Sequence, residues 1–159
     1  MNECARRNTI VVGVDGSEPS VQALRWAFKE ATLREASVTA AIFWTPPGIS
    51  PSSMPIPVVT PMDDETRVYR EVLTDALDRA RPGYEHVPVQ EIVEPGLAGA
   101  RLVELAEGAE MLVLGSHGHG HVVTALVGSV SAAVVRKANC PVVVIPTRLV
   151  EELGHSRNQ

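Results

Sequence analysis

Glycine and serine residues follow the apolar run 111–114 and precede a helical pattern. Gly115 begins this segment, and nine residues separate Gly118 from the pair Gly128-Ser129. Glycine lets the backbone turn tightly and lie close to a ligand because it has no Cβ. A Gly-Ser pair at a helix start offers backbone N–H groups and a hydroxyl, which suit a phosphate. The strand, glycine loop and helix start therefore predict a site for a nucleotide phosphate.

Three well-known signatures do not describe this loop. A P-loop requires Gly-Lys-Ser/Thr, which the chain lacks. The dinucleotide fingerprint requires a third glycine where Val123 follows Gly118 and Gly120. A hydrolase nucleophile elbow requires glycine two residues before the serine, but Leu114 stands there relative to Ser116. The loop is therefore of another type.

The Gly-x2-Gly-x9-Gly-Ser spacing of residues 115–129 resembles the motif of ATP-binding universal stress proteins. Segment 11–17 is similar to the opening strand and turn of that family, and segments 128–131 and 140–146 are similar to its final helix start and strand. The resemblance extends over residues 9–146. It implies a nucleotide-dependent regulator of the stress response that binds ATP, with Mg²⁺ as the expected companion ion.

Short β-branched runs alternate with helical patterns along the chain, an order that predicts a parallel sheet with helices on both faces. The strands are expected at 9–14, 38–44, 87–93, 111–115 and 142–145, and the helices after Ser17 and at 69–80, 102–109 and 130–138. The resemblance implies strand order 3-2-1-4-5 in one α/β domain of the Rossmann-like, adenine nucleotide alpha hydrolase-like class. That domain is expected over 9–146, with a disordered tail at 1–8 and a C-terminal tail at 147–159.

Ligands of open α/β sheets bind at the carboxyl ends of the strands, where the strand order reverses. With the implied order, this point lies between the first and fourth strands, so Gly13-Val14-Asp15 and Gly115 are expected to meet there. Asp15 either contacts the ribose or the metal–phosphate region, or forms an Asx-turn and helix cap. The resemblance implies that backbone groups of Phe43 contact adenine, while its side chain serves equally well as core.

His117, His119 and His121 alternate with glycine in the loop. Phosphate contact, a solvated loop and a Zn, Cu or Ni site remain open for them. No nearby carboxylate or cysteine completes a metal site, so none is predicted. His119 stands where the family commonly has a basic residue, which implies pH-sensitive binding. Ser129 either contacts phosphate or caps its helix. The predicted nucleotide site consists of Gly13, Val14, Asp15, Phe43, Gly115, Ser116, His117, Gly118, His119, Gly120, His121, Gly128, Ser129, Val130 and Ser131.

The composition argues against other function classes. The 159 residues carry a net charge of −5, which argues against nucleic-acid or anionic-membrane partners. No apolar run approaches the ~18 residues of a membrane span, and the polar first residues lack a signal-peptide pattern, so we expect a cytoplasmic protein. No nucleophile–base pair stands out, which predicts no catalytic residue and at most weak ATP hydrolysis. The alternatives are an AMP or cyclic-AMP binder and a dimeric interaction module with an empty site.

Two further segments carry predictions. Residues 45–64 contain six of the twelve prolines, which is typical of a flexible crossover or of a flap near the ligand. The apolar strand 142–145, between Pro141 and Pro146, would be a liability at an exposed sheet edge. The resemblance implies that this strand pairs with its symmetry mate in a homodimer. The competing interpretation is an internal strand covered by its own helices.

Overall fold

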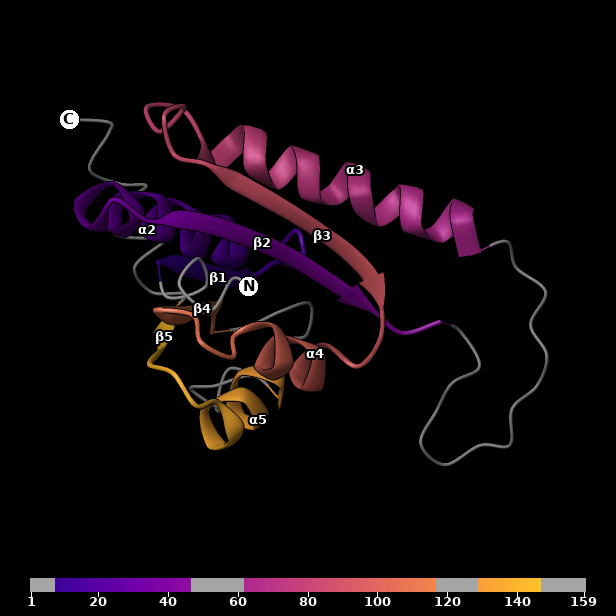
Figure 1. Ribbon diagram of the computed structural model, residues 1–159. Helices are drawn as coiled ribbons and strands as arrows, with labels where there is room; N and C mark the ends of the chain where they lie inside the picture. The colour runs from indigo at the N-terminus through magenta and orange to yellow at the C-terminus, as the bar shows by residue number, and fades with distance from the viewer. Residues whose placement is uncertain (1–7, 47–61, 117–128, 147–159) are drawn as a thin grey trace, which may run out of the picture.

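Five parallel strands form the sheet in the order β3-β2-β1-β4-β5 (Figure 1). The computed structural model describes residues 8–46, 62–116 and 129–146. The strands are β1 (Thr9–Gly13), β2 (Ser37–Trp44), β3 (Val89–Pro95), β4 (Met111–Gly115) and β5 (Val142–Ile145), and the helices are α2 (Glu18–Arg34), α3 (Met62–Ala80), α4 (Ala98–Leu105) and α5 (Ser129–Lys137). The expected α/β class and strand order are confirmed.

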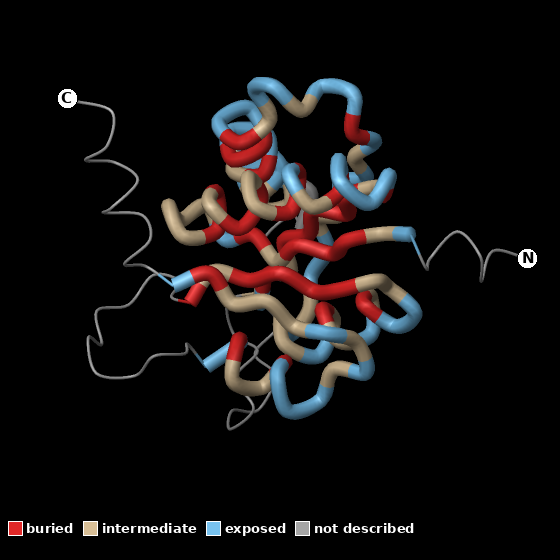
Figure 2. Tube along the Cα trace, turned by 90° about the vertical axis from the view of Figure 1, so that its left-hand side faces the viewer, coloured by how far each residue is buried: buried red, intermediate tan, exposed pale blue. Residues whose placement is uncertain are grey.

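The helices cover both faces of this sheet. Helices α2 and α3 pack on one face, and α4 and α5 pack on the other (Figure 1). Buried residues run through the layer between them, as Figure 2 shows. One apolar cluster lies under α2 and α3 and a second lies under α4 and α5. This arrangement explains why β1 and β4, which are covered on both sides, consist almost entirely of apolar residues.

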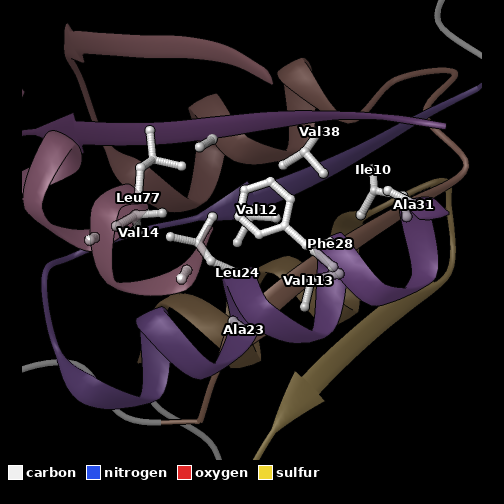
Figure 3. Close-up of a cluster of buried hydrophobic side chains, with 14 of the residues drawn as sticks. Ile10, Val12, Val14, Ala23, Leu24, Phe28, Ala31, Val38, Leu77 and Val113 are labelled. Atoms are coloured by element: carbon white, nitrogen blue, oxygen red, sulfur yellow. The ribbon is translucent and has the colours of Figure 1, made fainter. Parts of the chain in front are cut away.

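Helix α2 connects the core to the site. Ser17 is its N-cap and accepts a hydrogen bond from the Ser20 amide, and a proline stands in its first turn. Its Leu24 and Phe28 are fully buried among side chains of the strands (Figure 3). Burial of each such side chain stabilises the fold by roughly 1.5–3 kcal/mol. The same helix therefore anchors the core at its middle and presents its first turn at the carboxyl edge of the sheet.

The third strand lies two residues later than predicted. The spacing favoured 87–93, but the Val87 amide donates to the Tyr84 carbonyl at 3.0 Å in a turn, and the strand begins only after Pro88. Its burial does not alternate, because β3 is an edge strand and Ile92 and Val93 are both half-buried. The apparent period-two pattern was therefore a wrong guide to this element.

Two helix predictions also needed correction. The pattern 102–109 belongs to α4, which runs earlier and ends at Leu105, and Gly108 has φ 74°, a conformation that an α-helix does not contain. Helix α3 starts at Met62, inside the expected proline-rich segment 45–64. The remainder of that segment, 47–61, lies outside the described residues.

The tails assigned to 1–8 and 147–159 also lie outside the described part of the chain, except for Asn8. The Asn8 side-chain amide donates a hydrogen bond to the Glu35 carbonyl at 2.7 Å. The Asn8 backbone carbonyl accepts one from the Ser37 amide at 3.0 Å. Among the described helices, none has the length and apolar content that a membrane span requires.

Candidate functional site

The carboxyl ends of β1 and β4 lie side by side, as predicted. Val12 is paired with Val113, so the residues that follow each strand leave the sheet at neighbouring points. The chain after β1 leads to α2 on one face, and α5 lies on the opposite face (Figure 1). The strand order therefore reverses here, and segments about one hundred residues apart in sequence meet at the switch point, which is the place of the ligand crevice in open α/β sheets.

Two glycines at this edge are closely packed. A Cβ on Gly115 would lie 2.8 Å from the carbonyl carbon of Pro19, so the first turn of α2 rests directly on the end of β4. A Cβ on Gly13 would lie 2.5 Å from a methyl group of Leu114 and 3.0 Å from one of Leu102. These methyl groups are the ends of leucine side chains, which can shift, so packing constrains Gly13 less strictly than it constrains Gly115.

Ser131 joins the start of α5 to the end of β4. Its buried hydroxyl donates to the Gly115 carbonyl at 3.2 Å. The neighbouring Ser116 is also buried, and its amide donates to the Ile145 carbonyl at 2.8 Å. Ser129 and Val130 are exposed at the helix start. The first amides of a helix have no partner within it, so this end of α5 presents donors beside the crevice.

Asp15 forms the Asx-turn that was one of its two predicted roles. Its Oδ1 accepts from the Ser17 amide at 2.9 Å and from the Ser17 hydroxyl at 2.5 Å. The side chain is exposed, and Oδ2 accepts no hydrogen bond from the described residues. The turn therefore fixes the carboxylate while it leaves one oxygen available, so the two predicted roles are compatible.

Phe43 presents its backbone to the space beyond β1. In a parallel sheet, the N–H and C=O groups of alternate residues point to opposite neighbouring strands. Ala41 accepts from the Val14 amide on the β1 side, and Trp44 accepts from the Gly96 amide on the β3 side, both at 2.8 Å. The backbone groups of Phe43 consequently face the β1 side, past the last hydrogen bond between the described parts of β1 and β2. This edge offers one donor and one acceptor.

The Phe43 side chain has a different role. Its ring packs with the cluster under α4 and α5, and the guanidinium carbon of Arg101 lies 5.3 Å from its centroid. Arg101 is held there by Glu94 and Glu104, each at 2.7 Å. Hydrogen bonds to these two carboxylates raise the pKa of Arg101. The Phe43 side chain is thus part of the packing, while the Phe43 backbone faces the crevice.

Two residues at this edge escaped the sequence analysis. Gly16 has φ 80°, and a Cβ there would lie 2.6 Å from a methyl group of Val72 on α3. The Asp15-Gly16 dipeptide is a turn signal that could have indicated the positive φ of Gly16. Trp44 is buried at the end of β2 and stacks on Tyr69 of α3, with centroids 5.5 Å apart. The end of the second strand, 42–44, was expected to hold the base, but no role for the Trp44 side chain was predicted.

The comparisons with known proteins agree with this geometry. A sequence profile of the Universal stress protein family matches residues 6–146. The chain belongs to the universal stress protein family. A relative from Mycolicibacterium smegmatis, also called a universal stress protein, is 32% identical over 142 residues, which cover 89% of this chain and 47% of that protein. The chain spans about half the length of the curated relatives it matches.

Solved structures of universal stress proteins share the fold. One, in complex with cAMP, has a TM-score of 0.67 and 28% identity, and the match covers 88% of this chain and 97% of that one. Another, from Archaeoglobus fulgidus in complex with dAMP, has a TM-score of 0.62 and 27% identity, with 86% and 96% covered. Both of these relatives bind adenine nucleotides.

The glycine loop of this universal stress protein lies outside the described residues. The predicted site residues that fall there are His117, Gly118, His119, Gly120, His121 and Gly128. Their roles, including the three alternatives for the histidines, stay predictions from sequence. The described structure brings the other predicted residues to one edge of the sheet, from β1, β2, β4 and the start of α5.

Proposed function

We propose that this universal stress protein binds an adenine nucleotide at the crevice between β1 and β4, and that ATP with Mg²⁺ is its principal ligand. The backbone edge of Phe43 carries this proposal. Its adjacent donor and acceptor complement N1 and the N6 amino group of adenine. The start of α5 would hold phosphate, and the open oxygen of Asp15 is of the type that ribose hydroxyls or Mg²⁺ contact.

The proposed role is regulation of a cytoplasmic stress response through nucleotide occupancy. An adenine monophosphate is the second candidate ligand, because the two relatives described above are complexes with cAMP and dAMP. ATP remains the first candidate because the Gly-x2-Gly-x9-Gly-Ser spacing resembles the motif of ATP-binding members, and the exposed start of α5 supplies amide donors for phosphate. Hydrolysis, if it occurs, is expected to be slow, since the loop 115–129 contains no lysine or arginine to stabilise a transferring phosphoryl group.

Released nucleotide tests this proposal directly. The protein is purified without added nucleotide and denatured, and mass spectrometry identifies what it releases. Calorimetric titration of the emptied protein with ATP plus Mg²⁺, AMP and cAMP then ranks the ligands. We expect ATP to be released and to bind most tightly. Preference for AMP or cAMP would replace ATP by the second candidate, and the absence of binding by all three would contradict the proposal.

The protein is also proposed to be a homodimer that pairs through β5. This strand is one of the two sheet edges, and three of its four residues are half-buried valines. The other edge, β3, carries the exposed acids Glu91 and Glu94. Charged side chains on an edge strand oppose strand addition, whereas an apolar edge without charges leaves it open. Family membership supports the same pairing.

Substitution of Asp15 separates its ligand role from its turn role. Asp15→Ala is expected to weaken ATP binding by about 1–3 kcal/mol, the range for a lost hydrogen bond to a charged group. It also removes the acceptor of both Ser17 hydrogen bonds and should lower the melting temperature. Asp15→Asn keeps an Oδ1 acceptor, so it should weaken binding with little loss of stability. Calorimetry and thermal unfolding measure both. Wild-type affinity in both variants would show that Asp15 only forms the turn.

A further inference from the structure

The indole N–H of Trp44 has no hydrogen-bond partner in the part of the chain that the structure describes. The residue is 3% exposed, and Nε1 is a buried atom that has no hydrogen-bond partner among residues 8–46, 62–116 and 129–146. Buried tryptophan N–H groups usually have an acceptor, because their desolvation is otherwise not offset. The backbone carbonyl of Trp44, in contrast, has a partner, because it accepts a hydrogen bond from the Gly96 amide. The indole donor is therefore the unusual group in this strand end.

The indole ring is stacked on a side chain of α3. Trp44 and Tyr69 stack with 5.5 Å between centroids and 16° between planes. One turn further along α3, Val72 lies against Gly16, the residue after Asp15. A continuous row of contacts thus joins the end of β2 to the β1–α2 turn. Trp44 directly follows Phe43 at the carboxyl end of β2, and its ring packs on the same helix that touches the β1–α2 turn.

We infer that Trp44 is a specificity-determining residue of the nucleotide site, whose indole N–H donates to a purine ring nitrogen. The inference rests on the proposed function. If the Phe43 backbone takes N1 and the N6 amino group of adenine, N3 and N7 remain as acceptors on the base. A pyrimidine has no counterpart to N7 and N3 in these positions. The indole donor would therefore select a purine, at a cost to the free protein of one unsatisfied group.

Deaza analogues test this hydrogen bond atom by atom. In 7-deaza-ATP and 3-deaza-ATP, a C–H group replaces one ring nitrogen and removes one acceptor. ATP and both analogues are titrated into the wild type, Trp44→Phe and Trp26→Phe. Trp26 is the second of the two tryptophans and packs on α2 against the core, so Trp26→Phe is the matched control. Urea unfolding of each protein without ligand measures its stability separately.

We expect the wild type to bind one of the two analogues about three- to tenfold more weakly than ATP, the range for one hydrogen bond. Trp44→Phe should lose this discrimination, and Trp26→Phe should keep it. Such coupling between one side chain and one ligand atom isolates their interaction. In Trp26→Phe, Trp44 is the sole fluorophore, and its emission should change when ATP binds.

Three results would overturn the inference. The wild type would bind ATP and both analogues equally, or Trp44→Phe would discriminate as the wild type does, or Trp44 emission would not respond to ATP. The first and third require no variant at Trp44, so they decide the matter even if Trp44→Phe does not fold. Failure of the proposed function looks different, because the wild type would then bind none of ATP, AMP and cAMP.

Discussion

Gly115→Ala is expected to lower the free energy of unfolding by about 2–3 kcal/mol, near the upper end of the usual cost of overpacking. The added Cβ would stand 2.8 Å from both the carbonyl carbon and the Cβ of Pro19. These atoms belong to the rigid first turn of α2, so no flexible side chain can move aside. The helix start must shift, and with it Ser17 and the Asx-turn of Asp15. ATP binding should weaken at least about tenfold, or ~1.4 kcal/mol.

Gly99→Ala is the control for this substitution. Gly99 lies in α4, and its added Cβ would contact only the Cβ of Ala133 in α5, at an ordinary 3.6 Å. Alanine favours a helix over glycine by roughly 0.5–1 kcal/mol, so this variant should be as stable as the wild type or more stable. Chemical unfolding and calorimetry of the two variants give the comparison. Wild-type stability in Gly115→Ala would show that β4 and α2 are not packed as closely as the structure has them.

The strands that could be located from sequence are those whose surroundings are uniform. β4 and β5 begin and end where the apolar runs do, since β4 is covered on both faces and Pro141 and Pro146 bracket β5. β3 was displaced because its two faces are each only partly covered, with Val93 towards one cluster and Ile92 towards the other, and because a turn takes up Val87. The order of the strands came from family resemblance, because periodicity alone does not say which strands are neighbours.

The candidate site shows the same division. Gly115 and Asp15 could be singled out because turns and helix starts have local sequence signals. The close packing around Gly13 could not be predicted, because Leu102 and Leu114 approach it from other elements. The Trp44 indole stacks against Tyr69, which lies on a helix that begins 18 residues later. Contacts between distant segments decide such features, and a single sequence does not record them.

Val144→Lys is expected to convert a homodimer into a monomer. Val144 lies in the middle of the β5 edge and belongs to neither of the two core clusters, whereas Val142 and Val143 each pack against one of them. Lysine at this position should therefore spare the single chain. In a dimer with two-fold symmetry, each substitution occurs twice at one interface. Desolvation of an unpaired ammonium costs several kcal/mol, so the dissociation constant should rise at least about 100-fold.

Val68→Lys is the matched control, because Val68 is 53% exposed on α3, on a helix that packs on β2 and β3. Light scattering at tens of micromolar should give a dimer for the wild type and for this variant, and a soluble monomer for Val144→Lys. Unfolding midpoints at low concentration, where all three proteins dissociate, should agree. A monomeric wild type would reject the assembly outright. A dimeric Val144→Lys would place the interface elsewhere on the molecule, and β5 would then need another cover for its half-buried valines.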